Sequence, residues 1–142
     1  MSDLGGNATV STVYASSGAT PYSVTLTDDL AHRWLADEPA DKGGGNVAPD
    51  PTRLLLSSLG ACTVITLQMY AARKQWPLAG VQVELQFNPA GKPAAGTDIT
   101  RRITLQGALT DEQRKRLLQV ANACPIHNVL TGEIRIDSSL TN

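Results

Sequence analysis

A stretch of 19 residues without a charged side chain, from Leu54 to Ala72, constrains the fold of this chain more than any other feature. Asp50-Pro51 before it is a strong helix start, because aspartate caps free backbone amides and proline suits the first helical position. Since Pro77 ends the pattern, residues 51–75 are expected to form one helix, about 37 Å long at about 1.5 Å per residue. Its apolar residues cover almost every direction, which is typical of a helix buried in a core, an interface or a membrane.

One copy of a 142-residue chain is too small to cover such a helix on all sides, so we expect an oligomer. A membrane span is the alternative, because 19 uncharged residues nearly cross a bilayer. However, no aromatic belt sets an orientation, and five polar side chains are scattered along the helix: Ser57, Ser58, Thr63, Thr66 and Gln68. We therefore expect no membrane partner.

The composition excludes several classes of function. Twelve basic residues against thirteen acidic ones leave no general attraction to nucleic acid, and six aromatic residues are too few for a platform that stacks bases. Two cysteines are too few for a disulfide-stapled secreted scaffold or a four-cysteine metal site. Residues 1–7 are polar and glycine-rich and lack the pattern of a secretory signal. We therefore expect a location in the reducing cytoplasm and no nucleic-acid partner.

Strand patterns occur on both sides of the helix. Alternating apolar and polar residues predict three strands before it and a long-looped antiparallel hairpin after it, over residues 8–15, 22–27, 31–36, 81–87 and 99–105. On the last of these strands, four side chains share one face: Ile99, Arg101, Ile103 and Leu105. A glycine-rich loop that contains Gly43-Gly44-Gly45 connects the third strand to the helix.

The last third of the chain adds two more elements. Thr110 to Gln113 form a capping box that opens a second helix, and Ile134 to Asp137 alternate as a final strand. The chain is therefore expected to be a single α+β domain over residues 1–142. Its parts are the N-terminal strands and Gly-rich loop (1–49), the central helix (50–76), and the hairpin, second helix and last strand (80–142).

The two cysteines are the candidates for chemistry. Cys62 lies in the middle of the long helix, and taken alone this setting is typical of a small apolar core residue. Cys124 precedes Pro125, which places it at a helix N-cap, where free amides and the helix dipole favour a thiolate; an inert thiol at a helix end is the alternative. His127 follows three residues later, which suits a pair of metal ligands, a base beside a nucleophile, or an ordinary hydrogen-bonded histidine.

The segments around both cysteines resemble one known family. The run Pro49-Asp50-Pro51-Thr52-Arg53-Leu54-Leu55-Leu56, continued by Leu59-Gly60-Ala61-Cys62-Thr63, resembles the central helix of the OsmC/Ohr superfamily, the osmotically inducible and organic hydroperoxide resistance proteins. The run Ala121-Asn122-Ala123-Cys124-Pro125-Ile126-His127 is similar to the CPVH segment of that family. Residues 32–39 resemble a stretch of one OsmC-like branch. The resemblance covers about nine-tenths of the chain.

The resemblance implies an OsmC-like fold, in which antiparallel sheets wrap around long central helices in an intertwined homodimer. It also implies a thiol-dependent peroxidase that reduces organic hydroperoxides or hydrogen peroxide in oxidative or osmotic stress defence. Cys62 matches the peroxidatic cysteine, which attacks the O–O bond, and Cys124 matches the resolving cysteine, which forms a disulfide with the resulting sulfenic acid. An external dithiol then reduces that disulfide, and no cofactor or metal is implied.

One position departs from the family pattern. Well-characterised members use an arginine and a glutamate to activate the peroxidatic thiolate, and their glutamate stands where this chain has Thr52. We expect Arg33 to be the arginine, and Glu38, or else Asp37, to replace the glutamate from the preceding loop.

Two other functions are compatible with the same residues. The first is a non-catalytic OsmC-like dimer that binds a small apolar ligand at its interface and has inert thiols. The second is a metal site made by Cys62, Cys124 and His127, which would need a further ligand such as His32 or a carboxylate.

Overall fold

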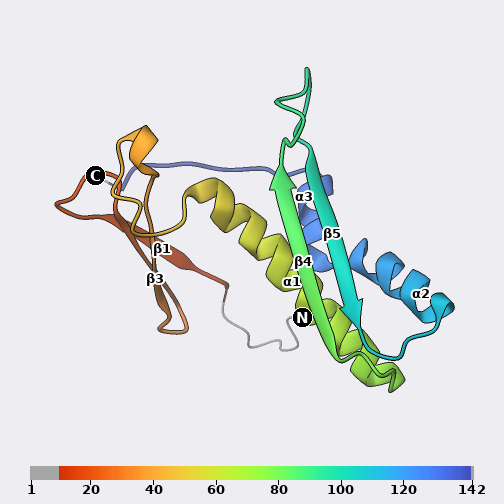
Figure 1. The fold of residues 1–142 in the computed structure, drawn as a ribbon. Coiled ribbons are helices and arrows are strands. Elements are labelled where there is room, and N and C mark those ends of the chain that lie inside the picture. The colour runs from red at the N-terminus through yellow and green to blue at the C-terminus, as the bar shows by residue number, and fades with distance from the viewer. Residues whose placement is uncertain (1–9, 142) are drawn as a thin grey trace. The chain divides into compact units, whose positions relative to one another are not determined.

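The computed structural model describes residues 10–141 and shows a mixed α+β architecture with antiparallel sheets, as predicted. Its elements are β1 (Val13–Ser17), β2 (Val24–Asp28), β3 (Arg33–Ala36), the 3₁₀ turn η1 (Ala40–Lys42), α1 (Pro51–Lys74), β4 (Gly80–Phe87), β5 (Ile99–Gln106), α2 (Asp111–Ala121) and α3 (Pro125–Thr131) (Figure 1). The chain divides into two compact units, and the boundary between Ser57 and Ser58 lies within α1.

The N-terminal unit contains a three-stranded antiparallel sheet in the order β1–β2–β3. The predicted strand over residues 8–15 is observed as β1 from Val13 onward, and residues 1–9 lie outside the described part of the chain. The turn after β2 is built by Asp28, whose carboxylate accepts hydrogen bonds from the backbone amides of Leu30 and His32. This local capping explains why the two acidic residues at 28–29 end a strand.

The loop between β3 and α1 is organised by Asp37, which is buried. Its carboxylate accepts hydrogen bonds from the backbone amides of Glu38 (2.8 Å) and Val47 (3.2 Å), and these bonds hold its pKa below the usual range. Gly44 lies so close to the Glu38 carbonyl that no Cβ would fit between them. The glycine-rich sequence therefore forms a tight loop around one carboxylate rather than an open linker.

Helix α1 begins and ends close to where the sequence predicts. Asp50 caps it by accepting a hydrogen bond from the Arg53 amide at 2.9 Å. Only one face is fully buried, at Leu59, Cys62, Thr63, Leu67 and Ala71, which follow the spacing of one helical stripe. Other apolar side chains stay exposed, and Met69 is 52% exposed. By length and composition α1 is also apolar enough to cross a membrane, a property that core helices share.

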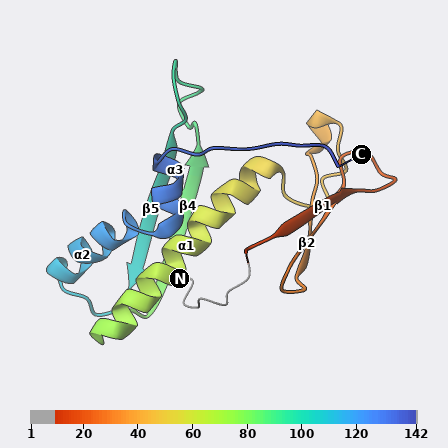
Figure 2. The same cartoon turned by 180° about the vertical axis from the view of Figure 1, so that it is seen from behind.

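The C-terminal unit is a β4–β5 antiparallel hairpin with helices packed on one face. The register pairs Val81 with Leu105 and Val83 with Ile103. The unit's part of α1, together with α2 and α3, lies on the same side of the hairpin in both views (Figures 1 and 2). One core cluster joins α1, α2 and the hairpin around Leu67, Leu117, Val120 and Ala121. The predicted capping box is present, because Thr110 and Gln113 exchange both hydrogen bonds.

The expected last strand is wrong for the described chain. Residues 133–141 have no regular secondary structure, and the two alternating apolar residues, Ile134 and Ile136, are 55% and 86% exposed. A strand is stabilised by hydrogen bonds to a neighbouring strand, and neither described sheet extends to this segment. The alternation at 134–137 indicates a strand propensity, but no strand among residues 10–141 pairs with this segment.

Candidate active site

Both cysteines lie in one buried cluster of the C-terminal unit. Cys62 on α1 is 2% exposed, Cys124 is fully buried, and both are free thiols. Leu59 completes the buried cluster, and four partly buried side chains pack against it: Leu85, Ile99, Ile126 and Leu130. The sequence places these two thiols 62 positions apart, and the fold brings them into the same apolar cluster, formed by residues of α1, the hairpin and α3.

The N-terminal turn of α3 provides backbone amides to both sulfur atoms. Cys124 is the N-cap of α3, as predicted, and its Sγ accepts a hydrogen bond from the His127 amide at 3.4 Å. The Ile126 amide donates to Cys62 Sγ at 3.5 Å. Cys62 Sγ also lies 3.9 Å from the Thr66 hydroxyl. Amide donors at a helix start favour negative charge on a sulfur atom, so the N-terminal turn of α3 can stabilise charge that develops on either sulfur during a reaction.

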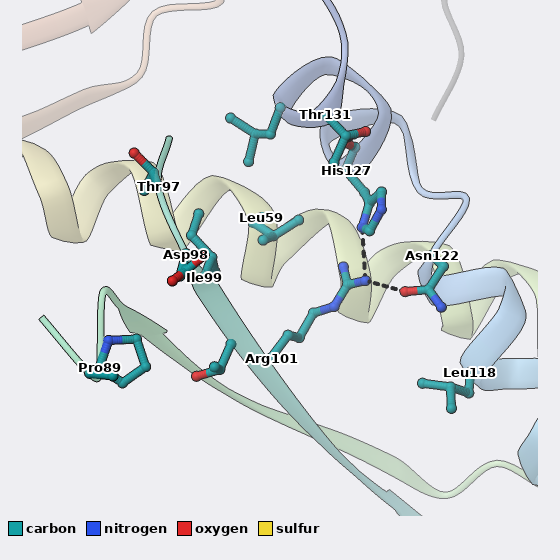
Figure 3. Close-up of a pocket in the computed structure, with 13 residues that line it drawn as sticks. Leu59, Pro89, Thr97, Asp98, Ile99, Arg101, Leu118, Asn122, His127 and Thr131 are labelled. Carbon is teal, nitrogen blue, oxygen red and sulfur yellow. Dashed lines mark hydrogen bonds between the residues drawn. The ribbon is translucent and has the colours of Figure 1, made fainter. Parts of the chain in front are cut away.

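A guanidinium group stands beside Cys124. Arg101, half-buried on β5, donates from Nη1 to Thr63 Oγ1 at 3.1 Å, and the same nitrogen lies 3.9 Å from Cys124 Sγ. Its Nη2 donates to Asn122 Oδ1 and to His127 Nδ1, both at 3.0 Å (Figure 3). All four partners are neutral groups, and none of the ion pairs in the described chain includes Arg101.

His127 is held as a neutral imidazole by this arrangement. Arginine can only donate, so Nδ1 of His127 is the acceptor and the ring proton belongs on Nε2. Burial of the ring lowers the pKa of His127 below its ordinary value of 6.5, and the positive charge of Arg101 lowers it further. His127 is therefore a hydrogen-bond acceptor at neutral pH and adds no positive charge to the site.

The lowered pKa of His127 predicts a pH dependence of stability. The unfolded chain takes up a proton on His127 as the pH falls through about 6.5, while the folded chain does not until a lower pH. The contribution of the neutral His127 ring to the free energy of unfolding is therefore fully present above about pH 6.5. It is lost as the pH falls towards the pKa of His127 in the folded chain. Urea unfolding of the wild type should show a steeper loss of stability between about pH 7.5 and pH 5 than His127→Gln. Parallel pH profiles for the two proteins would contradict this assignment.

A cavity of about 680 Å³ opens beside the cysteine cluster. Aliphatic side chains line much of it, and its polar end is formed by Arg101, Asn122 and His127, as Figure 3 shows. The remaining lining comes from the β4–β5 loop, β5 and the helices of the same unit: Leu59, Pro89, Ala90, Thr97, Asp98, Ile99, Thr100, Leu118, Leu130 and Thr131. The cavity can hold an organic molecule with a polar group directed at the Arg101 end.

The structure places the other predicted site residues in the N-terminal unit. Arg33 is exposed at the start of β3, and Glu38 follows that strand, partly buried. Asp37 is committed to amides of its own loop. Because the cysteines belong to residues 58–142, the activating roles of Arg33 and Glu38 stay predictions.

Arg101 is the site residue that the sequence pattern contained but did not single out. It occupies the face of β5 shared with Ile99, Ile103 and Leu105, where a charged side chain interrupts an apolar row. An arginine directed at a core needs acceptors there. Such an interruption is a usable signal, although the acceptors, on α1, α2 and α3, are distant in sequence.

The residues present offer no assembled metal site in the part of the chain described, 10–141. No group of three or more histidine, cysteine, aspartate or glutamate side chains is gathered there. His32, considered as a further ligand, instead pairs with Asp28 through Nδ1 at 2.8 Å in the N-terminal unit. Cys62, Cys124 and His127 are arranged around amides and Arg101 rather than around a common centre.

Comparison with protein families gives one match. The profile of the family described as OsmC-like protein matches residues 43–139, which include both cysteines and Arg101. A comparison with curated proteins gives no significant match.

Solved structures share the fold at low sequence identity. The OsmC-like protein of Mycoplasma pneumoniae is 21% identical, with a TM-score of 0.73 over 87% of this chain and 89% of its own. An organic hydroperoxide resistance protein OsmC of Legionella pneumophila is 19% identical, with a TM-score of 0.64 over 87% and 90%. An organic hydroperoxide resistance protein of Elizabethkingia anophelis, with thiocyanate bound, is 17% identical, with a TM-score of 0.65 over 89% and 91%.

Proposed function

Because this chain belongs to the OsmC-like protein family and holds two thiols in one buried cluster, we propose that it is a thiol-dependent peroxidase. The observation that carries the proposal is that Cys62 and Cys124 lie close together in the structure. They lie in the same cluster, and successive amides of α3 donate to the two sulfur atoms. The hydroperoxide resistance proteins of similar fold support a role in peroxide defence.

The proposed reaction has three steps. The Cys62 thiolate attacks one peroxide oxygen, the O–O bond breaks, and the other oxygen leaves as an alcohol or water after taking a proton. Cys62 is then a sulfenic acid. Cys124 attacks its sulfur, so that an S–S bond forms, the S–O bond breaks and water leaves. An external dithiol reduces the disulfide, becomes a disulfide itself and returns both protein thiols.

The cavity beside the cysteines supports organic hydroperoxides as the preferred substrates. Its volume of about 680 Å³ suits a molecule much larger than hydrogen peroxide, and its aliphatic lining contributes binding energy only to an organic group. We expect kcat/KM for cumene hydroperoxide to exceed that for hydrogen peroxide by at least about ten-fold, since roughly 1.4 kcal/mol of apolar contact suffices for that ratio. Equal values for the two peroxides would contradict a substrate role for this cavity.

The proposal includes a homodimer in the cytoplasm. OsmC-like proteins are soluble, so we interpret the apolar helix α1 as one that an interface covers. Arg33 and Glu38 are proposed to activate Cys62 within that assembly.

A charge on the exposed apolar face of α1 is expected to break this dimer. Sedimentation equilibrium should give twice the 15.0 kDa chain mass for the wild type and a lower mass for Met69→Glu. Gln86→Glu adds the same charge on the exposed face of β4 and is the matched control, which should stay dimeric. A monomeric wild type at micromolar concentration would refute the dimer.

Free-thiol counting tests the proposed function. The reduced protein should show two titratable thiols and lose both after one equivalent of cumene hydroperoxide. Cys62→Ser should keep its one remaining thiol under the same conditions. Thiols that persist in the wild type after prolonged excess peroxide would refute the peroxidase and favour the second candidate, a dimer that binds an apolar ligand. The same cavity supports that candidate, and binding of a fluorescent fatty acid analogue by the Cys62→Ser, Cys124→Ser double variant would measure it.

A further inference from the structure

We propose that Arg101 is a catalytic residue of the resolving step, because its guanidinium pairs with the negative charge that Cys124 carries as it attacks the Cys62 sulfenic acid. This inference rests on the proposed peroxidase function and assigns the cation that acts on the second thiol. It concerns residues of the C-terminal unit alone, and all contacts that support it lie within residues 58–142.

The contacts of Arg101 distinguish the two sulfur atoms. Nη1 of Arg101 lies 3.9 Å from Cys124 Sγ, whereas the polar neighbours of Cys62 Sγ are the Ile126 amide and the Thr66 hydroxyl. The distance of 3.9 Å is long for a hydrogen bond, and charge-assisted bonds are shorter. Ionisation of Cys124 would therefore strengthen a contact that is already directed correctly.

The positive charge of Arg101 is available to a thiolate. Its four partners are the Thr63 hydroxyl, the Cys124 thiol, the Asn122 amide oxygen and the neutral His127 ring, none of which carries a negative charge. Structural arginines are commonly paired with a carboxylate, which would reduce their effect on a nearby anion. Here the three uncharged acceptors fix the guanidinium in place and leave its charge to Cys124.

The chemistry of the resolving step gives this charge a specific effect. The Cys124 thiolate forms the S–S bond, the S–O bond of the sulfenic acid breaks, and hydroxide leaves with the proton that Cys124 released, as water. When a dithiol later attacks Cys62 of the disulfide, Cys124 is the leaving thiolate, and the same guanidinium stabilises it. Arg101 therefore assists both the formation and the reduction of the disulfide.

The test separates the two chemical steps by rapid quenching after one equivalent of cumene hydroperoxide. Dimedone added at each time point traps the Cys62 sulfenic acid, and mass spectrometry measures the trapped species and the disulfide. In Arg101→Met the rate of sulfenic acid formation is measured separately, because Arg101 also lines the proposed substrate cavity, and the readout is the conversion of sulfenic acid to disulfide. The disulfide should form at least ten-fold more slowly, so the trapped species accumulates.

Three further variants keep the test independent of folding defects. Asn122→Asp leaves Arg101 in place but puts a carboxylate on its Nη2, so it should slow the disulfide step to a similar degree. Arg101→Lys keeps the charge and should react faster than Arg101→Met. Arg102→Met removes the neighbouring arginine, which is 81% exposed and contacts Glu84 at 3.5 Å, and should match the wild type in both steps.

Several results would overturn the inference. Disulfide formation within two-fold of the wild type in folded Arg101→Met and Asn122→Asp would do so, as would equal slowing in Arg101→Lys and Arg101→Met. If the wild type does not react with peroxide at all, the proposed function fails. The pairing of the Arg101 guanidinium with the Cys124 thiolate is then measured directly in Cys62→Ser. The ultraviolet thiolate absorbance of its Cys124 at mildly alkaline pH should fall when Arg101→Met is added, and an unchanged spectrum would refute the pairing.

Discussion

Cys62→Ser is expected to reduce peroxide turnover by at least about a thousand-fold, because the serine hydroxyl is a far weaker nucleophile towards a peroxide oxygen than a thiolate. Cys124→Ser is the informative companion, since Cys62 keeps its position in the cluster and its Ile126 amide donor. That variant should release about one equivalent of alcohol per chain and then stop as a sulfenic acid.

A coupled dithiol assay and a single-turnover measurement of the alcohol check both variants. Retained turnover in Cys62→Ser would mean that a residue other than Cys62 is the nucleophile. Sustained turnover in Cys124→Ser would show that Cys124 is not the resolving cysteine.

Leu117→Ala is expected to have the largest effect on stability. Leu117 on α2 is fully buried and belongs to the core cluster with Leu67, so its truncation leaves a cavity in the C-terminal unit. Such changes cost about 2–5 kcal/mol, which corresponds to a fall in Tm of about 10 °C for a chain of this length. Leu118, the next residue, is 56% exposed, and Leu118→Ala should change stability by less than about 1 kcal/mol.

Thermal unfolding of the three proteins at equal concentration measures this difference. Similar Tm values for Leu117→Ala and Leu118→Ala would contradict the assignment of α2's buried face.

Local signals in the sequence predict most of the elements. The uncharged run from Leu54 together with the Asp50-Pro51 start predicts α1, and the structure confirms the cap that begins it. The capping box at Thr110 and the proline after Cys124 likewise predict the starts of α2 and α3. These predictions succeed because each depends on hydrogen bonds between residues only a few positions apart.

The prediction of a last strand fails for the opposite reason. Alternation at Ile134 and Ile136 describes side-chain preference, whereas a strand exists only when a second strand pairs with it. The same limit explains Arg101. Its position on β5 is evident from the alternation. Its role in the site depends on contacts with Thr63, Asn122 and Cys124, which come close to it only because three helices pack on the hairpin.

The two candidate cysteines illustrate which part of a site a sequence can supply. Their neighbouring motifs predict them as a functional pair, and the N-cap position of Cys124 follows from Pro125. That Cys62 shares a buried cluster with Cys124 depends on the contact of α1 with α3, which no local pattern encodes.

Peptide mapping of the wild-type protein after one equivalent of cumene hydroperoxide tests the central claim most directly. The sample is alkylated under non-reducing conditions before digestion, so that every remaining free thiol is marked. The account predicts one disulfide that joins the peptides of Cys62 and Cys124, formed at the rate at which alcohol is released. Both cysteines recovered as alkylated thiols, or oxidised without a bond between them, would contradict it.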